Sequence, residues 1–259
     1  FRSISETNLQ YTAYREGVVG RREVHDNMLD EIPEPGMMDL LLGGALAAGG
    51  SGALNQYIDR ELDRRMQRTA KRPMADGRLT DAEGLAFGLG MSLVSYFILA
   101  CFVNDLAALL SLAGIAYYVI LYSMWLKKAT VQNIVIGGGA GAIPPMVGYA
   151  AATGHLDWTA WILFAIIFMW TPPHFWALAI VRMKDYEHAG VPMMPVVRGE
   201  METRRQIFVY TIELVIVTLL LPILNLAGTF YLVSSLVLGG ALLYAAWKVW
   251  RTGGNKLAW

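Results

Sequence analysis

Long apolar runs alternate with short polar connections along most of the chain. Seven such runs are each close to the roughly 20 residues that a membrane-crossing helix needs. They cover residues 37–58, 84–102, 105–125, 131–152, 158–181, 206–226 and 229–250. The pattern predicts an all-α transmembrane helical bundle around a central cavity. The small residues concentrated in the first run predict close helix contacts there.

Residues 1–36 are instead polar and mildly acidic, and they contain no apolar core of the kind a signal peptide has. We expect an extramembrane or irregular N-terminal segment here, followed by one membrane helical domain over residues 37–259. Because the chain opens with Phe1 rather than Met, we expect the true N-terminus to lie upstream.

The basic residues indicate how the spans are oriented. Beyond residue 36, every Lys and Arg falls in alternate connections, within 60–78, 127–128, 182–205 and 248–256. The positive-inside rule therefore places these connections on the cytoplasmic side of the membrane. The four basic residues of the N-terminal segment, which this topology puts outside, fit less well. The connections 60–83 and 182–205 should thus meet on one membrane face.

Composition supports a membrane protein and narrows its partners. Apolar residues make up 55% of the 259 residues and charged residues only 16%, with 21 basic and 21 acidic side chains. This balance lacks the basic surplus of a nucleic-acid-binding protein. Cys101 is the only cysteine, so an internal disulfide is excluded.

The densest chemistry follows the first apolar run. Asn55, Asp59 and Asp63 are spaced four residues apart and should line one face of a helix. Seven cationic side chains follow within 60–78, among them Arg68 and Arg72, enough to hold a multiply charged anion. Carboxylates beside such a group predict Mg²⁺ bound together with a phosphate. A juxtamembrane helix with internally paired charges is the simpler alternative.

The connection after the fifth run repeats this arrangement, with Asp185 beside Arg182 and Lys184. If the two connections converge, they form a metal-diphosphate clamp at the mouth of an apolar cavity. Such a site suits a substrate with an anionic head and a long apolar tail, such as an isoprenyl diphosphate. Mg²⁺ and arginines would stabilise the charge on the departing diphosphate.

Within the fifth run, His174 follows a double proline and lies about 10 Å from the cytoplasmic end of the helix. A packing role and a ligand-facing role are both open for it. The proline pairs 144–145 and 172–173 should interrupt helical hydrogen bonding and bend their helices. For most of the aromatic residues near Tyr118 and Tyr122, an interfacial belt is the favoured interpretation.

Several motifs resemble the UbiA superfamily of intramembrane prenyltransferases. The pattern Asn55-x-x-x-Asp59-x-x-x-Asp63, with the later Arg68-Thr and Arg72-Pro, looks like its first aspartate motif. Within the superfamily, five further motifs resemble the protohaem IX farnesyltransferase, or haem O synthase, branch. They are YSMWLK (122–127), NIVIGG (133–138), GAIPP (141–145), TPPHFW (171–176) and DYEHAGVPMMPVV (185–197).

The resemblance implies farnesyl transfer from farnesyl diphosphate to a vinyl group of haem B, giving haem O and diphosphate. It implies an association with haem A synthase or terminal oxidase assembly. It therefore also implies a bacterial plasma membrane or a mitochondrial inner membrane, with the charged loops on the cytoplasmic or matrix side. It also implies roles for particular residues. Asn55, Asp59, Asp63 and Asp185 would be catalytic, with the three aspartates binding Mg²⁺. The substrate-binding residues would be Arg68, Arg72, Lys128, Asn133, His174, Arg182 and Lys184.

The superfamily usually has nine spans, against seven here, and other branches place a carboxylate where this chain has Ala189. Two alternatives remain open. A prenyltransferase acting on an aromatic quinone precursor would use the same aspartates. An ion-coupled transporter would need carboxylates deep within several spans, whereas these lie at one face.

Overall fold

The fold was analysed in a computed structural model that describes residues 34–252. All regular secondary structure in this part of the chain is helical, and seven segments are long and apolar enough to cross a membrane. The spans are α3 (Glu34–Arg64), α4 (Asp81–Phe102), α5 (Asp105–Ala116) continued by the π-helix η1 (Tyr117–Leu126), α7 (Asn133–Thr153), α8 (Trp158–Val181), α11 (Glu200–Ile223) and α12 (Thr229–Thr252). Short helices α6 (Lys127–Ala129), α9 (Met183–His188) and α10 (Met194–Arg198) lie in the connections. The predicted all-α bundle of seven spans is confirmed, and the chain is an integral membrane protein.

Two spans extend about six residues beyond the predicted apolar runs at their charged ends. Helix α3 continues past residue 58 to Arg64, which keeps Asn55, Asp59 and Asp63 on one helix. Helix α11 begins at Glu200 rather than 206, directly after Gly199, whose φ of 81° is a left-handed value that favours glycine. Polar residues can form these helical turns because the turns lie at the ends of the spans.

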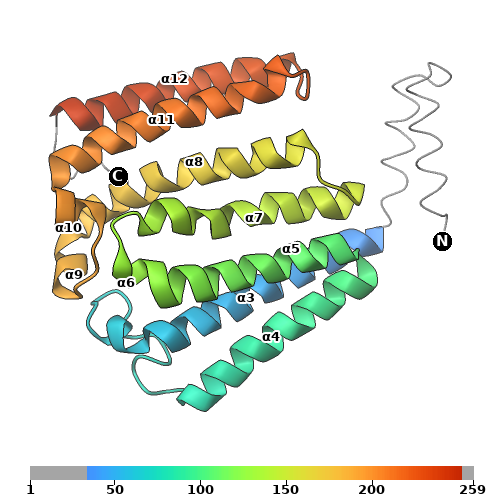
Figure 1. The fold of residues 1–259 in the computed structure, drawn as a ribbon, viewed down its shortest axis with the longest axis vertical. Coiled ribbons are helices and arrows are strands. Elements are labelled where there is room, and N and C mark those ends of the chain that lie inside the picture. Colours follow the sequence, from blue (N-terminus) through green and yellow to red (C-terminus); the bar gives the residue numbers. More distant parts are fainter. Residues whose placement is uncertain (1–33, 253–259) are drawn as a thin grey trace.

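The helices form a layered row in which α3 packs against α4, α5 against α7, α8 against α7 and α11, and α11 against α12 (Figure 1). Close approach of α3 and α4 depends on small residues, as predicted. A Cβ on Gly43 would lie 2.6 Å from Leu99 Cδ2, and one on Gly50 would lie 2.6 Å from Ser92 Oγ. The hydroxyl of Ser95 donates to the Gly43 carbonyl at 2.7 Å across the same contact.

The proline pairs do not end their helices. Helix α7 contains Pro144 and Pro145, and α8 contains Pro172 and Pro173, yet each is assigned as one continuous helix. Each proline removes one backbone donor, but the packed neighbours α5, α7, α8 and α11 hold the helices in place.

The connections divide between the two ends of the row. Residues 65–80 and helices α9 and α10 lie at one end, and the turns before α5, α8 and α12 lie at the other (Figure 1). The two charged connections therefore lie on the same side of the bundle, as the alternation of basic residues predicts.

Candidate functional site

The acidic face of α3 is buried. Asp59 is 0% exposed, Asp63 2% and Asn55 7%, although all three side chains are polar. The Asn55 amide donates to Asp59 Oδ2 at 2.8 Å, so neighbouring turns of α3 are linked along this face. Burial of two carboxylates requires compensating cations, because an unpaired charge inside a protein is costly.

Each carboxylate has its own cation, supplied by a different part of the chain. Lys127, the first residue of α6, pairs with Asp59 Oδ2, and Arg72 Nη1 lies 2.7 Å from Asp63 Oδ2. The connection after α3 folds back on the helix end, where Thr69 Oγ1 donates to the Asp63 carbonyl at 3.1 Å. The predicted grouping of Arg72 with the aspartates is therefore present.

Ser123 in η1 completes this network. Its hydroxyl accepts a hydrogen bond from Asn55 Nδ2 at 2.8 Å and donates to the Tyr118 carbonyl at 3.0 Å. Sequence reasoning missed both Ser123 and Lys127, and selected Lys128 instead. Nothing in the sequence shows that Lys127 faces α3, because the π-helix that precedes it changes the register. The substrate-binding role of Lys128 stays a prediction.

The two charged connections meet, as predicted. Met66, just after α3, belongs to the same buried apolar cluster as Tyr186, Val191 and Met193 from the later connection. Arg68 and Tyr186 both lie within electrostatic range of the Tyr122 hydroxyl, which places residues from both connections around η1.

Asp185 is at this end of the bundle but is not gathered with the α3 carboxylates. It is half-buried on α9, and Arg182 and Lys184 beside it are exposed. Among residues 34–252, no group of three or more His, Cys, Asp or Glu side chains is placed to hold a metal ion. The metal-binding role of Asp185 therefore stays a prediction.

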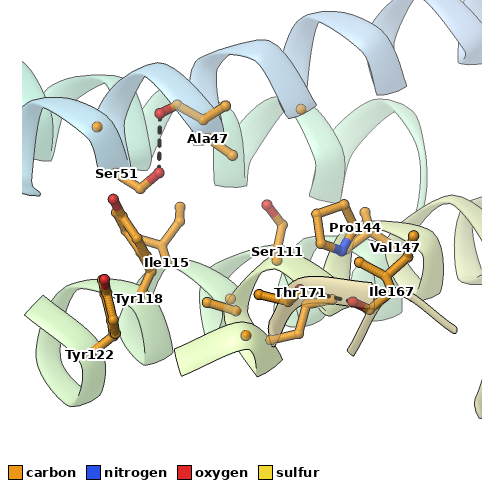
Figure 2. A pocket seen from close by; sticks show the side chains of 18 of the residues that line it. Ala47, Ser51, Ser111, Ile115, Tyr118, Tyr122, Pro144, Val147, Ile167 and Thr171 are labelled. Carbon is orange, nitrogen blue, oxygen red and sulfur yellow. Dashed lines mark hydrogen bonds between the residues drawn. The ribbon is translucent and has the colours of Figure 1, made fainter. Parts of the chain in front are cut away.

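An elongated cavity of about 810 Å³ begins one helical turn inward from Asn55, at Ser51 and Gly52. Its walls come from α3, α5, η1, α7 and α8, and most of the lining is apolar. The rings of Tyr118 and Tyr122 extend from η1 toward α3 at the charged end of the cavity (Figure 2). The volume falls in the range of roughly 300–1,000 Å³ that is typical of small-molecule sites. A charged mouth followed by an apolar chamber is the arrangement that the sequence predicts.

The two tyrosines are part of the cavity wall, a role that the general interpretation as an interfacial belt did not assign to them. Their rings stack with centroids 5.7 Å apart and planes 19° apart. Gly137 of α7 accommodates Tyr122, since a Cβ there would lie 2.2 Å from Tyr122 Cδ2. The signal in the sequence was the i, i+4 spacing of the tyrosines, which puts both on one helix face.

Residues 31–258 match the model of the UbiA prenyltransferase family. The chain belongs to this family. It is 52% identical over 218 residues to "Protoheme IX farnesyltransferase" of Roseiflexus sp. (strain RS-1), covering 84% of this chain and 41% of that protein. It is 50% identical over 216 residues to the protein of the same name from Gloeobacter violaceus, covering 83% of this chain and 71% of that protein. The chain thus spans about two fifths of the Roseiflexus relative.

Solved UbiA structures share the fold at low sequence identity. A UbiA homolog from Archaeoglobus fulgidus, bound to DMAPP and Mg²⁺, superposes with a TM-score of 0.73 at 16% identity, over 85% of this chain and 77% of that chain. The apo UbiA homolog from Aeropyrum pernix K1 gives 0.72 at 18% identity, over 88% and 84%. The predicted family and fold are therefore confirmed.

Two further predicted site residues of this UbiA protein, His174 and Asn133, make no hydrogen bond or ion pair with the α3 carboxylates. The ring of His174 is exposed and stacks on Trp170, with centroids 4.4 Å apart and planes 14° apart. Trp170 lines the cavity, whereas His174 does not. Asn133, at the start of α7, is fully buried, and neither heteroatom of its amide has a hydrogen-bond partner.

The oxygen atoms of the UbiA aspartate face fit a hard divalent cation. Asp59 Oδ1 is buried without a hydrogen-bond partner. Oδ2 of the same carboxylate accepts hydrogen bonds from both Lys127 and Asn55. Mg²⁺ prefers oxygen ligands and is usually held by one or two carboxylates together with substrate phosphates. The residues present supply that donor set.

Proposed function

We propose that this chain transfers a farnesyl group from farnesyl diphosphate to a vinyl group of haem B, giving haem O and diphosphate. One observation carries the proposal. Two buried carboxylates, each paired with a cation, lie on α3 two and three turns beyond the end of a largely apolar cavity of about 810 Å³. Relatives that are about half identical to this chain are named protoheme IX farnesyltransferase. That name supports the choice of haem as acceptor.

The α3 face would hold Mg²⁺ through Asp59 and Asp63, with Asn55 adding an amide oxygen. The bound ion would supply positive charge to the leaving diphosphate. Lys127 and Arg72 already bind carboxylate oxygens, and they would exchange these partners for diphosphate oxygens. Charge-assisted hydrogen bonds of this kind suit both oxyanions.

Other basic residues at the same end would complete the anion site. Arg68, Arg182 and Lys184 are exposed where the two connections meet, and each can reach a diphosphate or a haem propionate without the cost of burial. Asp185 would complete the metal site from the second connection. We assign Lys128 and Asn133 to substrate binding from their motifs alone.

The cavity would receive the farnesyl chain and keep water away from the allylic cation until that cation has added to the vinyl group. When the bond from the farnesyl C1 to oxygen breaks, its electron pair leaves with diphosphate, and the allylic cation adds to the vinyl group. Water then supplies the hydroxyl of the product and releases a proton. The stacked faces of Tyr118 and Tyr122 suit a transient cation at the charged end of the cavity. The Trp170 and His174 rings would offer a flat surface for the porphyrin.

We further propose that the charged end faces the cytoplasm or matrix, because it carries the basic connections. A place in a bacterial plasma membrane or mitochondrial inner membrane would put the product beside haem A synthase and terminal oxidase assembly.

The test is incubation of the purified chain in lipid nanodiscs with haem B, farnesyl diphosphate and Mg²⁺, with products separated by mass. We expect a farnesylated, hydrated haem, and we expect Asp59→Asn to lose it while keeping its helical circular dichroism. A parallel arm with 4-hydroxybenzoate tests the quinone-precursor alternative. Prenylation of that ring and not of haem would overturn the choice of acceptor, and unchanged turnover in Asp59→Asn would overturn the metal role.

A further inference from the structure

In both of its side-chain hydrogen bonds, Asn55 is the donor. Its Nδ2 atom has two hydrogens, and they go to Asp59 Oδ2 and Ser123 Oγ, both at 2.8 Å. An ionised carboxylate can only accept, so the atom facing Asp59 must be the nitrogen and not the oxygen of the amide. Ser123 in turn gives its own hydrogen to the Tyr118 carbonyl at 3.0 Å. The orientation of the Asn55 amide is therefore fixed by chemistry.

This orientation leaves the amide oxygen available. Asn55 Oδ1 accepts no hydrogen bond from any residue within 34–252. One helical turn along α3, Asp59 Oδ1 is also without a partner and is buried. Asn55 and Asp59 therefore stand one helical turn apart on the same face of α3, and each has one side-chain oxygen that can only accept and has no partner among the described residues.

The π-helix is what brings Ser123 to this position. In an α-helix a serine hydroxyl usually bonds back four residues, and residues five apart point about 140° away from each other. In η1 the Ser123 hydroxyl reaches the carbonyl five residues back, and the Lys127 backbone N–H likewise bonds to the Tyr122 carbonyl. The wider turn lets Ser123 contact Asn55 while Lys127, one turn on, contacts Asp59.

We propose that Ser123 is a positioning residue for the divalent cation. It holds the Asn55 amide with Oδ1 turned toward the cation that Asp59 binds, although Ser123 itself does not bind the ion. Ser123 is 0% exposed and makes no other side-chain contact that requires a hydroxyl. The inference rests on the proposed function only in taking this face of α3 as a cation site.

Mn²⁺ binding measured by electron paramagnetic resonance tests the inference without any turnover. The purified chain in nanodiscs is titrated with Mn²⁺ in the presence of inorganic diphosphate. We expect Ser123→Ala to raise the Mn²⁺ Kd about tenfold, which corresponds to about 1.4 kcal/mol. Ser95→Ala is the matched control: it removes another fully buried hydroxyl that bonds a carbonyl of α3, far from the acidic face, and should leave the Kd unchanged.

A double-mutant cycle separates positioning from general destabilisation. If Ser123 acts through Asn55, then Ser123→Ala should change the Kd less than about twofold in an Asn55→Ala background. Wild-type Mn²⁺ affinity in Ser123→Ala, or a full tenfold effect in the absence of the Asn55 amide, would overturn the inference. Ser123→Cys keeps the volume with a much weaker hydrogen-bonding group, and it takes the place of the alanine variant if that variant does not fold.

The outcomes also separate this inference from the proposed function. A wild-type chain that makes no farnesylated haem but shows the predicted Mn²⁺ pattern would refute the reaction and keep the cation site. A chain that makes the product while Ser123→Ala binds Mn²⁺ normally would refute only the role of Ser123.

Discussion

The pairing of Lys127 with Asp59 predicts a specific phenotype for Lys127→Met. The carboxylate is 0% exposed and the lysine side chain only 15%, so the substitution removes the cation from a buried pair. Breaking such a pair typically costs 3–5 kcal/mol, because the remaining charge stays buried. Asn55 still donates to the same oxygen at 2.8 Å, which favours the lower end, about 3 kcal/mol.

This cost should depend on divalent cations. For a chain of this size, about 3 kcal/mol corresponds to a fall in Tm of roughly 6–12 °C without metal. A divalent cation can then occupy Asp59 without displacing an ammonium group, so it should bind the variant more tightly than the wild type. Ligand binding to the folded state contributes about 2.7 kcal/mol at 100 times its Kd, enough to restore most of the loss.

Thermal unfolding in nanodiscs, followed by circular dichroism with and without Mg²⁺, measures both effects. Turnover of the variant should still fall about 10²-fold, since the leaving diphosphate loses one donor. Lys248→Met makes the same substitution at an exposed position of α12 and should change neither quantity. If Lys127→Met has the same Tm as the wild type, and Mg²⁺ raises that Tm no more than it raises the wild-type Tm, then the ion pair does not stabilise Asp59 in the free protein.

Three further substitutions test other parts of the structure. Gly137→Ala would place a Cβ 2.2 Å from the Tyr122 ring and should displace that ring. We expect it to destabilise the fold by about 1–3 kcal/mol and to reduce turnover. Gly240→Ala is the control, because its added Cβ meets nothing within 4 Å. Gly148→Phe fills open space in the cavity wall, so kcat/KM should fall more for farnesyl than for geranyl diphosphate. Burial raises the pKa of Asp157, but hydrogen bonds, including those from the first N–H groups of α8, outweigh this and leave the pKa below its ordinary value. Asp157→Ala should therefore cost about 1 kcal/mol at pH 7, with the difference from wild type shrinking as pH falls below about 4 in unfolding titrations.

The sequence was sufficient to predict the spans and their arrangement because both follow from strong local constraints. A bilayer requires long apolar helices, and basic residues mark one side. The same logic placed Asn55, Asp59 and Asp63 on one face, since a four-residue spacing within a helix leaves no other outcome. It also brought residues 65–80 and 182–199 to the same end, because four spans lie between them.

Contacts that depend on local helix geometry could not be predicted. A π-helix has no sequence signature as strong as a proline or a capping box, and η1 looks like ordinary apolar sequence up to Leu126. It nevertheless sets the register that brings Lys127 to Asp59. Spacing rules for an α-helix therefore fail at the residues where the acidic face meets its partners, Ser123 and Lys127.

The origin of the two cations bears on how the site would open for a substrate. Asp63 is neutralised by Arg72 from the connection after α3, whereas Asp59 is neutralised by Lys127 from the far end of η1. Both carboxylates can remain buried only while each keeps a positive partner. In an incoming metal-diphosphate, the metal ion would supply positive charge to the two carboxylates. The diphosphate would at the same time supply negative charge to Arg72 and Lys127. Exchange of both pairs in one binding event avoids any state with an unpaired buried charge. Binding of the metal or of diphosphate alone leaves one set of charges unmatched, so the two should bind cooperatively.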